Sequence, residues 1–162
     1  MGNIRIGDHV LDEINELKNL GVIFKNDLSF TNHITGVVTT ARQRLFLLHK
    51  CFLTKDPKIL IRAFKTYVLP ILDYCSQIWS PHRSRDIDRL ESVQRMFTKR
   101  LRGYQNLSYS ARLTKAGLSS LELRRVRADL VLCFKMLHCL IDLSNSAQLF
   151  VVDKNSRTRG HC

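Results

Sequence analysis

The chain has 162 residues, 44% of them hydrophobic and 25% charged, which is typical of one folded domain rather than of a disordered chain. Lys and Arg number 26 against 14 Asp and Glu, and the formal net charge of +12 favours a polyanionic partner such as nucleic acid. The sequence has no uncharged apolar run of the roughly 18 residues that a membrane helix needs, and its start lacks the apolar segment of a signal peptide. We therefore expect no membrane span, no membrane partner and no secretory leader.

The cysteines point to an intracellular protein. Their number is odd and they include no Cys-x-x-Cys pair; they are Cys51, Cys75, Cys133, Cys139 and Cys162. This pattern disfavours both a disulfide scaffold and a zinc site. The expected compartment is a reducing one, the cytoplasm or the nucleus.

Residues 1–30 are predicted to form a small β-hairpin structure. Gly7-Asp8 is a hairpin turn signal flanked by short apolar pairs. The apolar run 20–24 ends at a polar Lys-Asn-Asp segment and predicts a further strand.

From residue 31 the apolar residues recur with the helical period. The predicted helices are 31–52, 56–79, 84–101, 108–117 and 119–143. Their expected N-caps are Thr31 or Asn32, Asp56, Ser84, Ser108, and Ser119 in a capping box with Glu122. Pro70 should kink or break the second helix, because proline removes a backbone donor and its ring clashes with the preceding turn. Gly103 and Gly117 are the expected left-handed stops.

The last helix is apolar nearly all round from Leu130 to Ile141, which predicts that it is the buried centre of the bundle. The expected fold class is therefore mainly α, a helical bundle with a small N-terminal β-hairpin. We expect a hairpin segment at 1–30, a helical domain at 31–143 and a tail at 144–162 with one strand-like stretch at 148–152.

The positive charge is concentrated in the middle of the chain. Residues 83–127 hold 12 Lys and Arg against 4 Asp and Glu. On the helix 84–101, Arg95, Lys99 and Arg102 are spaced i, i+4, i+7 opposite the apolar face, with Arg100 beside them, a pattern that suits a phosphate backbone. The helix dipole alone also favours acids early and cations late in a helix, so for this helix the two interpretations stand equal.

The last predicted helix favours an external anion more clearly. Arg124, Arg125 and Arg127 lie in its first two turns, where the helix dipole disfavours cations. Arg112 and Lys115 on the preceding short helix add to the same positive field. We predict that these five and the four residues on helix 84–101 contact nucleic acid, in preference to a merely solvated surface.

Signals of catalysis are absent from the sequence. It contains no adjacent Asp-Asp pair, no Gly-rich phosphate loop and no His-x-x-x-His, and Asp86 and Asp88 point to different sides of a helix. We predict no catalytic and no metal site. Four aromatic residues could stack on bases, but their helical spacing favours core packing; they are Phe64, Tyr67, Tyr74 and Trp79.

Short motifs follow one another along nearly the whole chain: Leu20-Gly21-Val22, Leu28-Ser29-Phe30, Tyr67-Val68-Leu69-Pro70, Ile78-Trp79-Ser80-Pro81, Gly117-Leu118-x-Ser120-Leu121-Glu122 and Thr158-Arg159-Gly160-His161. In this order they resemble the reverse transcriptases of LINE-type (non-LTR) retrotransposons, and the jockey-like group in particular. The resemblance implies that residues 1–30 are the end of the palm near the primer-grip hairpin and that the helices beyond are thumb-like. It also implies an RNA/DNA template–primer duplex as partner, together with the palm and fingers of the polymerase.

The family's polymerase centre is a Phe/Tyr-x-Asp-Asp motif with a further upstream aspartate, which together hold two Mg²⁺ ions. On this resemblance that centre would precede Met1 and the chain would stop before the family's usual end. The expectation is a C-terminal fragment that binds nucleic acid, holds no cofactor and polymerises nothing alone. The alternatives left open are a helical protein–protein interaction module, which would form oligomers, and a non-functional retroelement remnant that does not fold stably.

Overall fold

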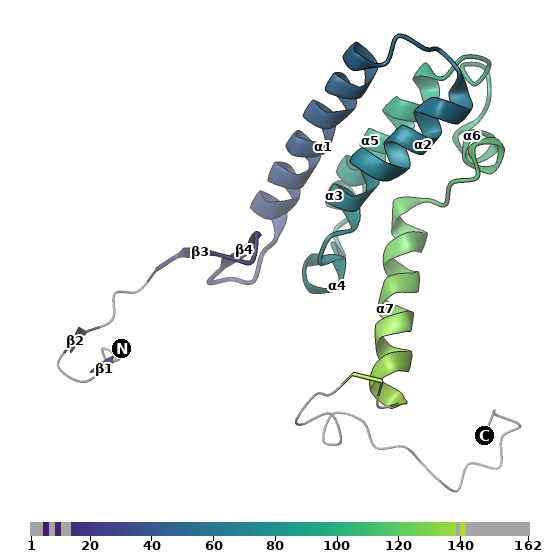
Figure 1. Ribbon diagram of the computed structural model, residues 1–162. Coiled ribbons are helices and arrows are strands. Elements are labelled where there is room, and N and C mark those ends of the chain that lie inside the picture. Colours follow the sequence, from purple (N-terminus) through teal and green to yellow (C-terminus); the bar gives the residue numbers. More distant parts are fainter. Residues whose placement is uncertain (1–4, 7–8, 11–13, 139, 142–162) are drawn as a thin grey trace, which may run out of the picture. The chain divides into compact units, whose positions relative to one another are not determined.

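The structure is a computed structural model that describes residues 5–6, 9–10, 14–138 and 140–141 (Figure 1). It is mainly helical with short antiparallel strands at the N-terminal end, which confirms the expected fold class. The chain divides into two compact units, residues 1–125 and 126–162. The expected tail at 144–162 and its strand-like stretch lie outside the described residues.

Two β-hairpins precede the helices. β1 (Arg5–Ile6) pairs with β2 (His9–Val10), as predicted, and β3 (Glu16–Asn19) pairs with β4 (Val22–Lys25). The strand predicted at 20–24 begins two residues too early, because Leu20 and Gly21 form the turn of the second hairpin with φ of 47° and 86°. Two consecutive left-handed residues are what a two-residue hairpin turn requires. The sequence did not reveal β3, whose four exposed residues show no apolar alternation.

The helix α1 (Thr31–Cys51) buries a continuous apolar face, with residues Ile34, Val38, Ala41, Leu45 and Leu48. The predicted caps Thr31 and Asn32 are wrong, since the N-cap position is Phe30 and no side chain caps the helix. The Thr31 hydroxyl instead donates a hydrogen bond of 3.1 Å to the carboxylate of Asp86.

The predicted helix 56–79 is divided into α2 (Pro57–Tyr67), α3 (Leu69–Asp73) and α4 (Ser76–Trp79). Asp56 is the N-cap of α2, as expected, and its side chain accepts a bond of 2.9 Å from the Lys58 backbone N–H. Pro70 lies in the first turn of α3, where its missing N–H costs no helical bond, so the break near this proline is confirmed.

The next helices are α5 (Ser84–Arg100) and α6 (Tyr109–Ala116). The predicted N-cap Ser84 is wrong: Ser84 is the first helical residue, and the N-cap position is Arg83. The expected signals of α6 are confirmed: the Ser108 hydroxyl accepts from the Ala111 N–H, and Gly117 ends the helix with φ of 59°.

The core lies between α1, α2, α3 and α5, which Figure 1 shows beside one another. Phe64 of α2 and Phe97 of α5 stack at its centre, with ring centroids 4.1 Å apart. Core packing is thus confirmed for Phe64 and Trp79, which are fully buried. The prediction of core packing is wrong for Tyr67 and Tyr74, whose side chains are exposed.

The helices α1 and α5 run parallel to each other. Polar contacts join Thr31 to Asp86 at their beginnings and Arg42 to Ser92 further along, with an Nη2–Oγ distance of 3.0 Å. Both helices therefore end on the same side of the bundle, where His49 of α1 lies near Phe97 of α5.

The last helix, α7 (Leu121–Leu137), is shorter than predicted, and Ser120 rather than Ser119 caps it by accepting from the Leu123 N–H at 3.2 Å. The prediction that it is the buried centre of the bundle is wrong. The core is completed by other helices and receives only Leu121 from α7. Five apolar side chains further along are between 44% and 65% exposed; they are Leu130, Val131, Phe134, Leu137 and, beyond the helix, Leu140.

Candidate nucleic-acid interface

The sequence contains a long stretch without any acid. From Ser92 to Leu121 there are six Lys and Arg and no Asp or Glu. The structure places this acid-free segment on the second half of α5, on the turn that follows and on α6. Charges in this stretch can be neutralised only by acids that lie outside it in the sequence or by an external anion.

At the end of α5, three of the predicted binding residues have no acid partner among the described residues. Lys99 and Arg100 lie in its last turn and Arg102 follows it, and all three side chains are exposed. Within the described part of the chain, none of the three forms a hydrogen bond or an ion pair. The helix ends before Arg102, so the predicted i, i+7 stripe continues into the turn rather than along the helix.

Arg95 is exposed but partly neutralised. Its Nη1 lies 3.3 Å from Oδ1 of Asp88, two turns earlier on α5, and its guanidinium lies 5.2 Å from the centroid of the Tyr109 ring. An exposed ion pair of this kind contributes at most about 1 kcal/mol to stability, so a phosphate can displace the Asp88 carboxylate from Arg95.

Arg112 and Lys115 of α6 have structural contacts instead. The buried Arg112 donates from Nη1 to the backbone carbonyl of Arg95 at 3.2 Å. Lys115 donates from Nζ to the carbonyl of Gly103 at 3.0 Å and lies 4.8 Å from the Tyr104 ring centroid. Both cations therefore fasten α6 to the end of α5.

The arginines of α7 also separate into different roles. Arg124 makes a forked contact with the carboxylate of Asp73, with Nε at 3.2 and 3.1 Å from the two oxygens, and this bond raises the pKa of the guanidinium. Arg125 is buried, while Arg127 is exposed and belongs to the second unit. The position of Arg124 in the first turn of α7 led us to expect an external anion. Asp73, 51 positions earlier in the chain, supplies the negative charge instead, and no local sequence pattern reveals this pairing.

One buried carboxylate holds the acid-free segment in place. Oε2 of Glu91 accepts from the Leu121 N–H at 3.0 Å, and Oε1 accepts from the Tyr109 hydroxyl. Gln94 supports the same junction by donating to the Ser119 carbonyl at 2.9 Å. Burial, and next the bond to Glu91, raise the pKa of Tyr109 well above its ordinary value, so its hydroxyl stays a donor.

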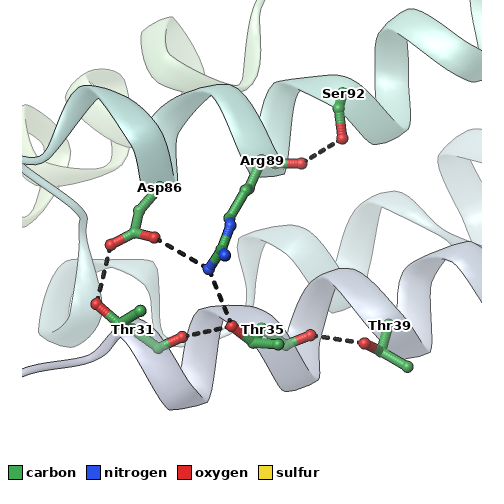
Figure 2. Close-up of polar contacts among 6 residues, drawn as sticks. All are labelled: Thr31, Thr35, Thr39, Asp86, Arg89 and Ser92. Carbon is green, nitrogen blue, oxygen red and sulfur yellow. Dashed lines mark hydrogen bonds and ion pairs between the residues drawn. The ribbon is translucent and has the colours of Figure 1, made fainter.

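Arg89, in the second turn of α5, is neutralised by a polar ladder toward α1 (Figure 2). Arg89 lies 3.6 Å from Asp86 and donates to the Thr35 hydroxyl at 3.2 Å, and Thr31 donates to the other oxygen of Asp86. Asp86 is therefore a structural acid between two helices. Lys99 and Arg100 at the C-terminal end of α5 have no such carboxylate partner among the described residues.

A cavity of about 590 Å³ opens at this end of the bundle, and we call it the basic cavity. Its wall includes the cations Lys55, Arg100 and Arg102 and the ring of His49. Among the described residues that line it, none is Asp or Glu. Burial, and next the charge of Arg100, lower the pKa of His49, which keeps the imidazole neutral at neutral pH. The sequence predicts neither Lys55 nor His49 as a site residue, because they come to line one cavity with Arg100 only in the folded chain.

The described residues contain no group of three or more His, Cys, Asp or Glu that could hold a metal ion. No helix among them has both the length and the apolar character to cross a membrane.

Comparison with known proteins gives a match to a nematode protein. The chain is 26% identical over 117 residues to a Caenorhabditis elegans protein described as "Uncharacterized protein B0403.1". The match covers 69% of this chain and 58% of that protein, so the chain spans less than two thirds of the relative's length. No family model and no solved structure matches the chain.

Proposed function

We propose that the chain binds the phosphate backbone of nucleic acid, as the thumb-like C-terminal part of a LINE-type reverse transcriptase. The proposal rests on the ordered motifs that resemble that family and on one structural observation. In the acid-free segment, Lys99, Arg100 and Arg102 are exposed side by side in sequence, with no carboxylate partner among the described residues.

Such cations bind a polyanion by releasing the counterions condensed on it, so the affinity depends steeply on salt. Contacts with phosphates position a duplex but carry little base information. The expected activity is therefore binding to a template–primer duplex without marked sequence preference. The sequence contains no adjacent Asp-Asp pair, and we expect no nucleotide incorporation by this chain alone.

The test is a salt titration of binding to an RNA–DNA hybrid, for the wild type and for the variant Lys99→Gln/Arg100→Gln/Arg102→Gln. We expect the variant to bind more weakly at low salt. Its slope of log affinity against log salt should become shallower by about 0.7–0.9 for each phosphate that the variant no longer neutralises.

A matched control removes the same charge elsewhere, in Lys58→Gln/Arg62→Gln/Arg85→Gln, whose three side chains are also exposed. This control should retain most of the affinity and the salt slope. Equal losses in the two variants would show that only the net charge matters, and salt-independent binding would remove the proposal.

A second candidate function rests on the exposed apolar side chains Leu130, Val131, Phe134 and Leu137 of α7 and Leu140 beyond it. An exposed apolar patch commonly marks a protein interface. The chain would then be a helical interaction module, for another copy or for the palm and fingers of a polymerase. Size-exclusion chromatography with light scattering tests this candidate, because a stable oligomer that ignores nucleic acid favours it over the first.

A further inference from the structure

We propose that the basic cavity binds one nucleotide unit of a nucleic-acid strand, with the phosphate between Lys55, Arg100 and Arg102 and the base against Phe52 and Leu53. The inference rests on the proposed function and adds to it a defined pocket for a single nucleotide. It follows from the charge, size and chemistry of the cavity wall.

The charge of the wall selects an anion. Three cations line the cavity without an Asp or Glu among its described lining residues. Because α1 and α5 are parallel, both of their C-terminal ends lie at this side and each contributes about half a negative charge. That partial compensation leaves a positive excess for three full charges, and arginine forks match phosphate oxygens in geometry.

The size of the cavity exceeds what a phosphate ion alone would fill. Its volume of about 590 Å³ lies within the range of roughly 300–1,000 Å³ that is usual for small-molecule pockets. A nucleotide has a phosphate at one end and a flat base at the other, and it needs a pocket of this kind.

The remaining wall supplies the second half of the recognition. Phe52, Leu53 and Leu60 form an apolar part, and Leu53 is 95% exposed on the α1–α2 turn. A base can stack on the Phe52 ring and cover such a leucine, which favours a nucleotide over a phosphate ion alone. Gln105 accepts from the Gly103 N–H at 3.0 Å through its side-chain oxygen, which leaves its amide N–H₂ group as a donor at the cavity.

The pKa of His49 should report on a bound anion. Its Nε2 is buried and has no hydrogen-bond partner in the described part of the chain. Burial, and next the charge of Arg100, lower the pKa of this imidazole. The other charged groups of the cavity wall, Lys55 and Arg102, are also cations. Among groups at this wall, only a bound anion would therefore raise the pKa of His49.

The experiment uses the full chain labelled for NMR and titrated with uridine monophosphate, with uridine and inorganic phosphate as separate probes. We expect the monophosphate to shift the signals of residues 52–55 and 100–105 and to raise the pKa of His49. Uridine should do neither, and inorganic phosphate should bind more weakly than the nucleotide. A single-stranded oligonucleotide should displace the nucleotide.

The variant Arg100→Gln/Arg102→Gln should weaken nucleotide binding by about tenfold or more, because each hydrogen bond to a charged group contributes about 1.5–3 kcal/mol. The matched control is Lys99→Gln, a neighbouring exposed cation that does not line the cavity. It should weaken duplex binding while leaving nucleotide binding unchanged.

Several outcomes would overturn the inference. They are the absence of shifts with uridine monophosphate, equal binding of nucleotide and inorganic phosphate, shifts that persist in Arg100→Gln/Arg102→Gln, or a nucleotide that the oligonucleotide does not displace. If these occur while the hybrid still binds with a steep salt dependence, the cavity inference fails and the proposed function stands. If the nucleotide binds but no polynucleotide does, the proposed function fails and the cavity is a site for free nucleotides.

Discussion

The buried carboxylate of Glu91 accepts a hydrogen bond from the backbone N–H of Leu121, thirty residues later in the chain, at 3.0 Å. The first N–H groups of a helix have no partner within it, so this contact supplies an acceptor at the beginning of α7. The same carboxylate accepts from Tyr109 of α6. One residue of α5 therefore holds both the beginning of α6 and the beginning of α7.

The first prediction concerns Glu91→Gln. A glutamine has one side-chain acceptor instead of two, so either the Leu121 N–H or the Tyr109 hydroxyl loses its partner. We expect a destabilisation of about 1–3 kcal/mol, measured as a shift of the urea unfolding midpoint. The exposed Asp88→Asn is the matched control and should cost less than about 1 kcal/mol. Equal effects of the two substitutions would contradict the role given to Glu91.

The second prediction separates structure from binding at Arg124. Its forked bond to Asp73 is partly exposed, with side-chain accessibilities of 39% and 30%. A double-mutant cycle with Asp73→Asn and Arg124→Gln should give a coupling energy of about 1 kcal/mol or less. Arg124→Gln should leave the affinity for an RNA–DNA hybrid unchanged. A clear loss of affinity would mean that this arginine contacts phosphate and that the pairing with Asp73 opens on binding.

The third prediction concerns pH and His33. Burial, and next the charge of Lys18, lower the pKa of this histidine below 6.5, and its Nδ1 accepts from the Ile23 N–H at 3.4 Å. The unfolded chain then binds a proton more readily than the folded one. Stability is therefore complete above about pH 6.5 and falls as the pH decreases from there through the pKa of the folded state.

Urea unfolding at about pH 7.5 and about pH 5.5 measures this loss, and His33→Gln should reduce it, because glutamine does not titrate. The rest of the chain is identical in the two proteins and serves as the internal reference. An identical pH dependence of the two proteins would show that His33 is not protonated on unfolding.

The sequence predicted the helical elements well, because their signals are local. Asp56-Pro57, Ser108 and Gly117 act within one turn, and the structure uses all three as expected. Apolar periodicity also located the core face of α1. It failed for the last helix, since periodicity shows that a helix is apolar but not whether other helices have already completed the core.

The candidate site could be predicted only in part. Charge spacing identifies Lys99, Arg100 and Arg102, and each of them is exposed and without an acid partner in the described chain. The pairing of Arg124 with Asp73 and the burial of Arg112 depend on tertiary contacts between residues far apart in sequence. The basic cavity was missed for the same reason, because it exists only where the ends of α1 and α5 meet.

The parallel arrangement of α1 and α5 also bears on how fast the protein folds. Their polar contacts join residues 50, 54 and 55 positions apart, so a long loop must close before this pair of helices is formed. Closing such a loop costs chain entropy that a bundle of sequential antiparallel helices avoids, and folding slows as contacts become less local. We therefore expect α2 and α3 to associate early and the ladder between Thr31 and Asp86 to close late, so that its loss accelerates unfolding more than it slows refolding.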